Sequence, residues 1–274
     1  MLKKTLLALG IFSSILMAQP LKMATTTSTD NTGLLDDLAP KFQQDTGIQL
    51  QWVSVGTGNA LKLGENCDVS VLLVHSPKVE ENYVKQGFGV DRKAVMYNDF
   101  VIIGDPSYLK TFQDKTLKEV FQTIQKNKIP FISRGDKSGT HNKELSIWKS
   151  LGGKTPSKQD TWYKESGQGM LATIQIASEQ KAITLTDRGT FIKYTANLKG
   201  KQGLVLLSQG DDALKNFYSV IAVNPKRCKN VDYQGATRFI EWITGTQGQQ
   251  AIKDFKLDGQ ELFTPNAQNQ NHAK

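Results

Sequence analysis

The chain has 274 residues, of which 38% are hydrophobic and 22% are charged, so it can bury a substantial core, most simply as two domains. Its formal net charge of +8 favours anionic partners. The lysines are scattered, however, and form no arginine-rich or aromatic-interleaved stripe, which argues against nucleic-acid binding.

The N-terminus has the layout of a secretory signal peptide. Lys3 and Lys4 precede an apolar run from Thr5 to Met17, and the small residue Ala18 follows. An uncleaved anchor or a buried helix would carry a similar pattern, but the run is short for a membrane span. We therefore expect residues 1–18 to be removed and the mature protein to be soluble in the periplasm. Loss of the two lysines lowers the net charge from +8 to +6.

A helix is predicted near the start of the mature chain. Its apolar side follows the three-to-four-residue spacing of a helix and consists of Leu34, Leu35, Leu38 and Phe42. Asp30 or Asn31 is expected to cap its start, and Gly47 is expected to end it. Pro40 lacks a backbone donor and crowds the preceding turn, so a kink or break is expected near Ala39.

Short apolar runs rich in β-branched residues alternate with helical patterns along the rest of the chain. The runs lie at 48–55, 69–75, 100–104, 129–133, 204–208 and 218–223. This alternation predicts an α/β protein with mainly parallel sheets. The similar runs FVIIG and SVIAV suit two crossings between lobes, although two ordinary strands of one sheet fit the pattern equally well. The last dozen residues are expected to be disordered.

The two cysteines, Cys67 and Cys228, are 161 positions apart and form no disulfide framework. They could pair in an oxidising compartment, so both the paired and the free state remain open. His141 and Glu144 share a helix face and could hold a metal ion, but no further ligands cluster near them, and no metal site is predicted.

Three segments place glycines and hydroxyls between a predicted strand and a helix. They are TTTST at 25–29, GTG at 56–58 and SRGDKSGT at 133–140. Helix N-termini offer unpaired N–H groups and partial positive charge, and hydroxyls add donors, so each segment can hold an anion. Such a turn is more often only a helix cap. Three of them facing each other across a cleft between lobes favour an anion site.

Arg134 is the sharpest single feature of the third segment. Its planar, permanently charged guanidinium suits an anion with several oxygens. A surface pair with Asp136 is the alternative.

The sequence contains none of the common catalytic motifs. It has no GxSxG elbow, Walker loop, HExxH or dinucleotide GxGxxG. Ser138, His141 and Asp136 lie within one loop, which is poor geometry for a nucleophile, a base and an orienting acid. We therefore expect a protein that is not an enzyme, with a secreted hydrolase of anionic esters as the alternative from another class.

Six segments in order resemble the periplasmic tungstate-binding proteins of tungstate ABC importers. They are TTTST, VSVGTGNALKLGENCDVSVLLVHSP, YNDFVIIG, SRGDKSGTHNKE, WYKESGQGM and TLTDRGTF. The likeness runs from about Leu21 to Pro265. It implies a type II periplasmic binding protein with two lobes, each a mainly parallel sheet flanked by helices, and two crossover strands. The expected lobes are 19–101 with 222–274, and 102–221.

The resemblance also implies a function and a site. We expect the protein to bind tungstate as its oxyanion, without a cofactor, and to deliver it to an ABC permease, as a monomer. The ligand residues carried over by position are Thr26, Thr27, Ser28, Thr57, Arg134, Ser138 and Thr140.

Molybdate and phosphate are the alternative ligands. Ionised tungstate and molybdate only accept hydrogen bonds, whereas protonated phosphate also needs an acceptor. Asp30 and Asp136 lie close enough in sequence to serve as that acceptor. No side-chain chemistry here separates tungstate from molybdate.

Overall fold

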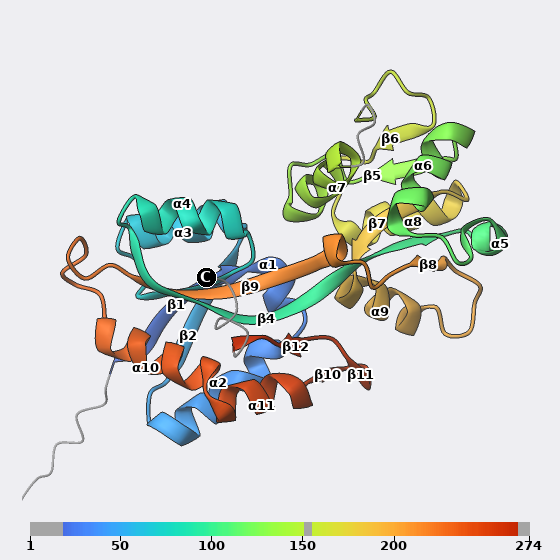
Figure 1. Cartoon of the computed structure of the whole chain (residues 1–274). Helices are drawn as coiled ribbons and strands as arrows, with labels where there is room; N and C mark the ends of the chain where they lie inside the picture. The colour runs from blue at the N-terminus through green and yellow to red at the C-terminus, as the bar shows by residue number, and fades with distance from the viewer. Residues whose placement is uncertain (1–18, 151–154, 268–274) are drawn as a thin grey trace, which may run out of the picture.

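The computed structural model describes residues 19–150 and 155–267, so the predicted signal peptide at 1–18 lies outside the described residues. Two groups of strands and helices are joined by two long strands (Figure 1). Within the described ranges, no helix is long and apolar enough to cross a membrane.

The first lobe has three parallel strands with helices on both faces (Figure 1). The strands are β1 (Leu21–Thr26), β2 (Leu50–Val55) and β3 (Val71–Val74). The helices are α1 (Thr27–Asp30), α2 (Leu34–Thr46), α3 (Thr57–Glu65), α4 (Pro77–Lys85), α10 (Tyr233–Thr244) and α11 (Thr246–Asp254). Three short strands near the C-terminus complete it: β10 (Lys256–Leu257), β11 (Gln260–Glu261) and β12 (Thr264–Pro265).

The second lobe repeats this design. Its strands are β5 (Phe131–Ser133), β6 (Tyr163–Glu165), β7 (Ile183–Asp187) and β8 (Val205–Ser208), and β5 runs parallel to both β6 and β7. Its helices are α5 (Leu109–Phe112), α6 (Leu117–Asn127), α7 (Gly139–Ser150), α8 (Met170–Glu179) and α9 (Arg188–Asn197), with 3₁₀ turns η1 (Pro106–Tyr108) and η2 (Asp212–Leu214).

Two antiparallel strands, β4 (Gly89–Gly104) and β9 (Lys215–Val223), connect the lobes. They pair with each other from Gly89 opposite Val223 to Asp99 opposite Lys215. Beyond Asp99, β4 pairs with β7 and β8 of the second lobe, whereas β9 pairs with β3 of the first. FVIIG and SVIAV therefore belong to two crossover strands, as predicted. The lobe boundaries remain predictions, and this pairing favours a division nearer Asp99 and Lys215.

The strand order is β2-β1-β3-β9-β4-β7-β5-β6, with β8 and β12 also paired to β4. The strands internal to each lobe are mainly parallel, while the crossover strands run antiparallel to their neighbours. This arrangement confirms the predicted α/β fold class.

Alternate residues of each strand enter different cores because successive side chains point to opposite faces of a sheet. In the first lobe, Met23 packs with α2, α10 and α11, whereas Ala24 packs with α3 and α4. In the second lobe, Phe131 packs with α6 and α7, whereas Ile132 packs with α8 and α9. Each fully buried aromatic or aliphatic side chain of this kind contributes about 1.5–3 kcal/mol.

Pro40 does not break α2, contrary to the prediction. The helix is continuous from Leu34 to Thr46, and Pro40 lies on its exposed side. Because the carbonyl freed by the missing donor faces water on that side, the helix tolerates the residue. The predicted start was also wrong: Gly33 caps α2. The predicted end is confirmed, since Gly47 adopts the left-handed conformation there.

The predicted disorder near the C-terminus was wrong for residues 263–267. Thr264 and Pro265 form β12 against Tyr97 and Met96, and Ala267 N donates to the side chain of Gln249 at 3.0 Å. Residues 268–274 lie outside the described residues.

Cys67 and Cys228 form a disulfide. It links the loop after α3 to the segment between β9 and α10, so both cysteines belong to the first lobe. The sequence left open whether the two cysteines pair, and the structure shows that they do.

Candidate anion-binding site

The carboxyl ends of the three parallel strands meet at one edge of the first lobe. Thr26 of β1 lies opposite Val55 of β2, and Thr25 lies opposite Leu73 of β3. The residues that follow these ends, Thr27, Thr57 and His75, are therefore placed along that edge. The sheet register alone brings two of the three predicted anion segments together.

The hydroxyls of the first segment form a local network. Thr26 Oγ1 accepts from the backbone N–H of Thr29 at 3.4 Å and lies 2.7 Å from Thr29 Oγ1, so Thr26 caps α1. Ser28 Oγ lies 3.1 Å from Thr26 Oγ1. Thr26 is buried, Ser28 is half-buried and Thr27 is exposed. The predicted hydroxyls of Thr26 and Ser28 therefore lie together. The Thr27 hydroxyl takes no part in this network.

His75 completes the network, and sequence reasoning missed it. Its Nε2 lies 3.1 Å from both Ser28 Oγ and Thr26 Oγ1, and its Nδ1 lies 3.1 Å from Asn216 Oδ1. Burial lowers the pKa of His75, although the Asn216 hydrogen bond and the charge of Asp187 oppose this effect. The signal available in the sequence was its position directly after an apolar strand.

The third predicted segment leaves β5 and is held tightly by the neighbouring β6 segment. The Arg134 carbonyl accepts from Gly167 N at 2.8 Å and from Ser166 Oγ at 3.3 Å. Gly135 has φ of +63°, and a Cβ added there would lie 2.5 Å from Glu165 Cβ. Only glycine fits this turn without displacing β6.

Arg134 forms an ion pair, and one of its other donors is buried without a partner in the described structure. Its Nη2 donates to Asp136 Oδ2, as the alternative reading of the sequence had it. Its Nε is buried, however, and has no hydrogen-bond partner among the described residues. A buried donor without a partner destabilises the folded protein, so a bound acceptor at this position would be stabilising.

The rest of the segment binds its own backbone. Asp136 Oδ1 accepts from Ser138 N at 3.1 Å, Ser138 Oγ accepts from His141 N at 3.3 Å, and His141 Nδ1 accepts from Lys137 N at 3.0 Å. The His141 ring is thus bonded to backbone and not to the Ser138 hydroxyl. These three side chains do not form a catalytic triad.

Thr57 and Thr140 lie in the first turns of α3 and α7. Both are half-buried, and neither hydroxyl has a hydrogen-bond partner within 19–150 and 155–267. They remain free to donate to a ligand.

The two lobes approach each other at His75. A Cβ added to Gly139, the first residue of α7, would lie 3.7 Å from His75 Cε1. The loop that carries Arg134 and Ser138 therefore ends beside the ring that holds Thr26 and Ser28. The described hydrogen bonds do not join Arg134 directly to those hydroxyls, so the predicted ligand set as a whole remains a prediction.

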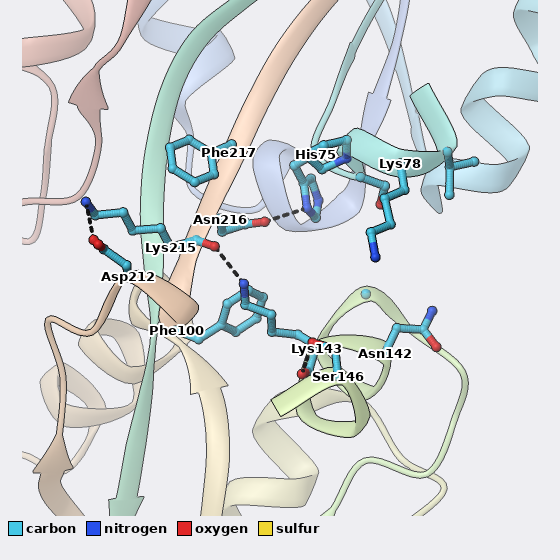
Figure 2. Close-up of a pocket in the computed structure, with 14 residues that line it drawn as sticks. His75, Lys78, Phe100, Asn142, Lys143, Ser146, Asp212, Lys215, Asn216 and Phe217 are labelled. Atoms are coloured by element: carbon cyan, nitrogen blue, oxygen red, sulfur yellow. Dashed lines mark hydrogen bonds and ion pairs between the residues drawn. The ribbon is translucent and has the colours of Figure 1, made fainter. Parts of the chain in front are cut away.

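A pocket of about 410 Å³ lies between the lobes, beside this point. Figure 2 shows His75 and Lys78 on one side and Asn142, Lys143 and Ser146 on the other, with Asn216 to the left of His75 and bonded to it. None of the seven predicted ligand residues lines this pocket, although Gly139, between Ser138 and Thr140, does. Lys143 Nζ donates to the Lys215 carbonyl at 2.8 Å, and burial lowers the pKa of Lys143.

Glu144 has a structural role. Its carboxylate accepts from Tyr163 OH at 2.7 Å and from Trp148 Nε1 at 3.1 Å. Burial raises the pKa of Glu144 to about 7, although these bonds and one from Ser133 oppose the shift. No group of three or more metal-ligating side chains is found in the described part of the chain.

Comparison with known proteins gives a consistent result across both lobes. A family model described as a PBP superfamily domain matches residues 18–247. A relative in Campylobacter jejuni, the tungstate-binding protein TupA, is 59% identical over 240 residues, which are 88% of this chain and 88% of the relative.

Two solved structures are similar over most of the chain. The tungstate-binding protein TupA from Desulfovibrio alaskensis G20 shares 52% identity with a TM-score of 0.88, over 91% of this chain and 100% of that one. The tungstate ABC transporter structure from Geobacter sulfurreducens shares 46% identity with a TM-score of 0.74, over 86% of this chain and 99% of that one.

Proposed function

The chain belongs to the PBP superfamily and, within it, to the TupA family of tungstate-binding proteins, and from this membership we propose that it captures tungstate between its lobes and delivers it to an ABC permease. It is a transport protein and not an enzyme. Binding stabilises the closed form, because only there do both lobes contribute donors.

The buried, unpaired Nε of Arg134 carries the assignment of the site. A permanently charged donor without an acceptor at the end of a strand is explained if an anion supplies that acceptor. We propose that the ligand set is Arg134 with the hydroxyl or backbone groups of Thr26, Thr27, Ser28, Thr57, Ser138 and Thr140. The hydroxyls of Thr57 and Thr140 support this set because they are free.

The expected affinity follows from the number of donors. A hydrogen bond to a charged group contributes about 1.5–3 kcal/mol, so about six of them give roughly 9–18 kcal/mol in total. Ordering and desolvation subtract several kcal/mol. A free energy near −12 kcal/mol, which corresponds to a nanomolar dissociation constant, is within reach.

The two nearby carboxylates argue against phosphate. Asp30 accepts from Trp52 Nε1 and from Ser54 Oγ, both at 2.7 Å, and Asp136 is bonded to Arg134 and to Ser138 N. Each oxygen of these two carboxylates already accepts a hydrogen bond within the protein, so an acceptor for a protonated phosphate is less available and phosphate is disfavoured. Molybdate has the same charge and hydrogen-bonding character as tungstate, and it remains the alternative ligand.

We place the protein in the periplasm, exported through residues 1–18 and acting as a monomer. The signal-like pattern of those residues and the disulfide support export, since disulfides form in oxidising compartments.

A thermal-shift titration of the mature protein with tungstate, molybdate, sulfate and phosphate tests the function. At about 1,000 times the dissociation constant, a ligand of the native state adds about 4 kcal/mol of stability. For a chain of this size, that corresponds to roughly 8–16 °C in melting temperature. Tungstate is expected to give the full shift, and phosphate and sulfate little. The absence of a tungstate shift would overturn the proposal.

A further inference from the structure

We propose that His75 is a positioning residue of the anion site: its ring fixes the directions of the Thr26 and Ser28 hydroxyl protons and connects them to the crossover strands. This inference rests on the proposed function. It concerns how the hydroxyls are held, and not which anion is bound.

The hydrogen bonds of Asn216 determine which ring nitrogen of His75 carries the proton. Asn216 Nδ2 donates to Asn98 Oδ1 at 2.9 Å and lies 3.2 Å from Tyr218 OH. This turns the amide oxygen of Asn216 toward His75 (Figure 2). Since an amide oxygen only accepts, His75 Nδ1 must hold a proton. In the neutral ring, Nε2 is then an acceptor.

Nε2 therefore accepts one hydroxyl proton, although two hydroxyls lie within reach. Thr26 Oγ1 and Ser28 Oγ are each 3.1 Å away, and each hydroxyl has a single proton. Thr26 is buried and caps α1, whereas Ser28 is half-buried. With an anion bound, Thr26 donates to the ring and Ser28 donates to the anion. Without the ring, both protons are free to turn toward other acceptors.

The same chain of hydrogen bonds reaches both crossover strands. Asn216 belongs to β9 and Asn98 to β4, and both are buried. The His75 ring also packs on Tyr218 of β9, with 4.8 Å between ring centroids. The hydroxyls at the anion site are thus fixed relative to the segment where the lobes are joined.

Protonation of His75 changes this arrangement in a defined direction. A charged ring donates from both nitrogens, which releases both hydroxyl protons toward the anion and adds a positive charge beside it. The charged groups around the ring are Asp187 at the end of β7, Lys78 of α4, Lys143 of α7 and the Lys215–Asp212 pair. Burial opposes the protonated ring most strongly, whereas the Asn216 hydrogen bond and the charge of Asp187 favour it. Tungstate affinity should therefore rise as the pH falls through the pKa of His75.

The test is calorimetric titration of sodium tungstate into the full mature chain between pH 8 and pH 5, because burial lowers the pKa of His75 below its ordinary value. For the wild type we expect affinity to increase at least about threefold over this range. His75→Gln, whose amide replaces Nε2 but does not titrate, should give a flat profile. His75→Ala should bind about tenfold more weakly at pH 8 because nothing orients the hydroxyls. His141→Gln is the control for the pH slope alone: His141 does not contact these hydroxyls, so the slope should stay as in the wild type, but His141 Nδ1 accepts from Lys137 N in the Arg134 loop, so its absolute affinity is not compared.

Each outcome has a distinct meaning. If His75→Gln keeps the wild-type slope, or His141→Gln abolishes it, the inference on His75 is overturned while tungstate binding stands. If the wild type does not bind tungstate at any pH, the proposed function itself fails. Imidazole nitrogen shifts in the wild-type protein give a test without mutation: at pH 8 the proton of His75 should be on Nδ1, and a proton on Nε2 would overturn the inference.

Discussion

Arg134 donates from Nη2 to the carboxylate of Asp136, two residues further along the same loop, while its Nε stays buried without a partner in the described structure. The ion pair neutralises part of the guanidinium charge, but it uses Nη2 alone and not two parallel N–H donors. The remaining donors are therefore available to a ligand.

Arg134→Ala is expected to weaken tungstate binding at least about tenfold, because one charge-assisted hydrogen bond contributes about 1.5–3 kcal/mol. Asp136→Asn should not weaken it, since the amide oxygen can still accept from Ser138 N. Arg238→Ala, at an exposed position on α10, is the control. Calorimetry measures the affinity and a melting curve checks folding. Wild-type affinity in Arg134→Ala would remove the residue from the site.

Gly135→Ala tests the packing of the Arg134 loop, with Gly87→Ala as its matched control. Both glycines have positive φ, +63° and +77°, but a Cβ meets nothing within 4 Å at Gly87. Gly87→Ala should cost about 1–2 kcal/mol for the backbone conformation alone. Gly135→Ala should cost more, because the new methyl group displaces Glu165, and it should also weaken tungstate binding. Denaturant unfolding and calorimetry provide the comparison, and equal effects of the two variants would contradict it.

Lys78 extends into the pocket between the lobes, near the proposed anion site, and is exposed (Figure 2). The positive charge of Lys78 should raise the association rate of a dianion without contributing to its binding in the complex. Lys78→Gln is expected to slow tungstate association about twofold at low ionic strength, and the difference should vanish at high salt as screening increases. Stopped-flow kinetics measure the rate, with Lys253→Gln on α11 as the control. A change confined to the dissociation rate would show that Lys78 is a ligand instead.

Glu144 makes stability depend on pH. Its folded-state pKa of about 7 lies above the ordinary value of 4.5, so the folded protein holds this proton more tightly than the unfolded chain. The resulting stabilisation is complete below pH 4.5 and is lost as pH rises to 7, with a total of about 3 kcal/mol. Glu144→Gln should remove this part of the pH dependence. Urea unfolding at pH 5 and pH 7.5 compares the two proteins, and parallel curves would contradict the assignment.

The Cys67–Cys228 disulfide closes a loop of 161 residues. In the chain-entropy description, such a loop gives about 5 kcal/mol. The double variant Cys67→Ser with Cys228→Ser should lose a comparable amount of unfolding free energy. Its tungstate affinity should not change, since Cys67 follows the end of α3 opposite to Thr57, about 13 Å away along a nine-residue helix. A large loss of affinity would show that the bridge also shapes the site.

Sequence patterns correctly predicted those helices, strands and turns that depend on residues close together in the chain. The apolar spacing of α2 and the β-branched run of β3 identified those elements, and the glycine and hydroxyl segments marked helix starts. Pro40 was misread because its effect depends on which side of the helix faces water. That orientation is set by packing against Phe239 and Trp242, about two hundred residues later.

The contribution of His75 lay beyond sequence reasoning for the same reason. Its partners Thr26, Ser28 and Asn216 are 49, 47 and 141 positions away. No spacing rule relates such residues, because only the sheet order brings the ends of β1, β3 and β9 together. Arg134 was identified from sequence since its loop is local, but its unpaired Nε became visible only in three dimensions.

The pairing of β4 with β9 constrains how the molecule can move. Two independent linkers would let the lobes rotate and slide in several directions. Hydrogen bonds between β4 and β9, from Gly89 opposite Val223 to Asp99 opposite Lys215, instead turn the connection into a ribbon that resists shear along its length. We therefore expect relative motion of the lobes to be mainly bending of this ribbon, which is interrupted only by register shifts between Val90 and Lys93 and between Ala94 and Met96. Such a connection would return the same facing loops to the same register at each closure, without a search over orientations.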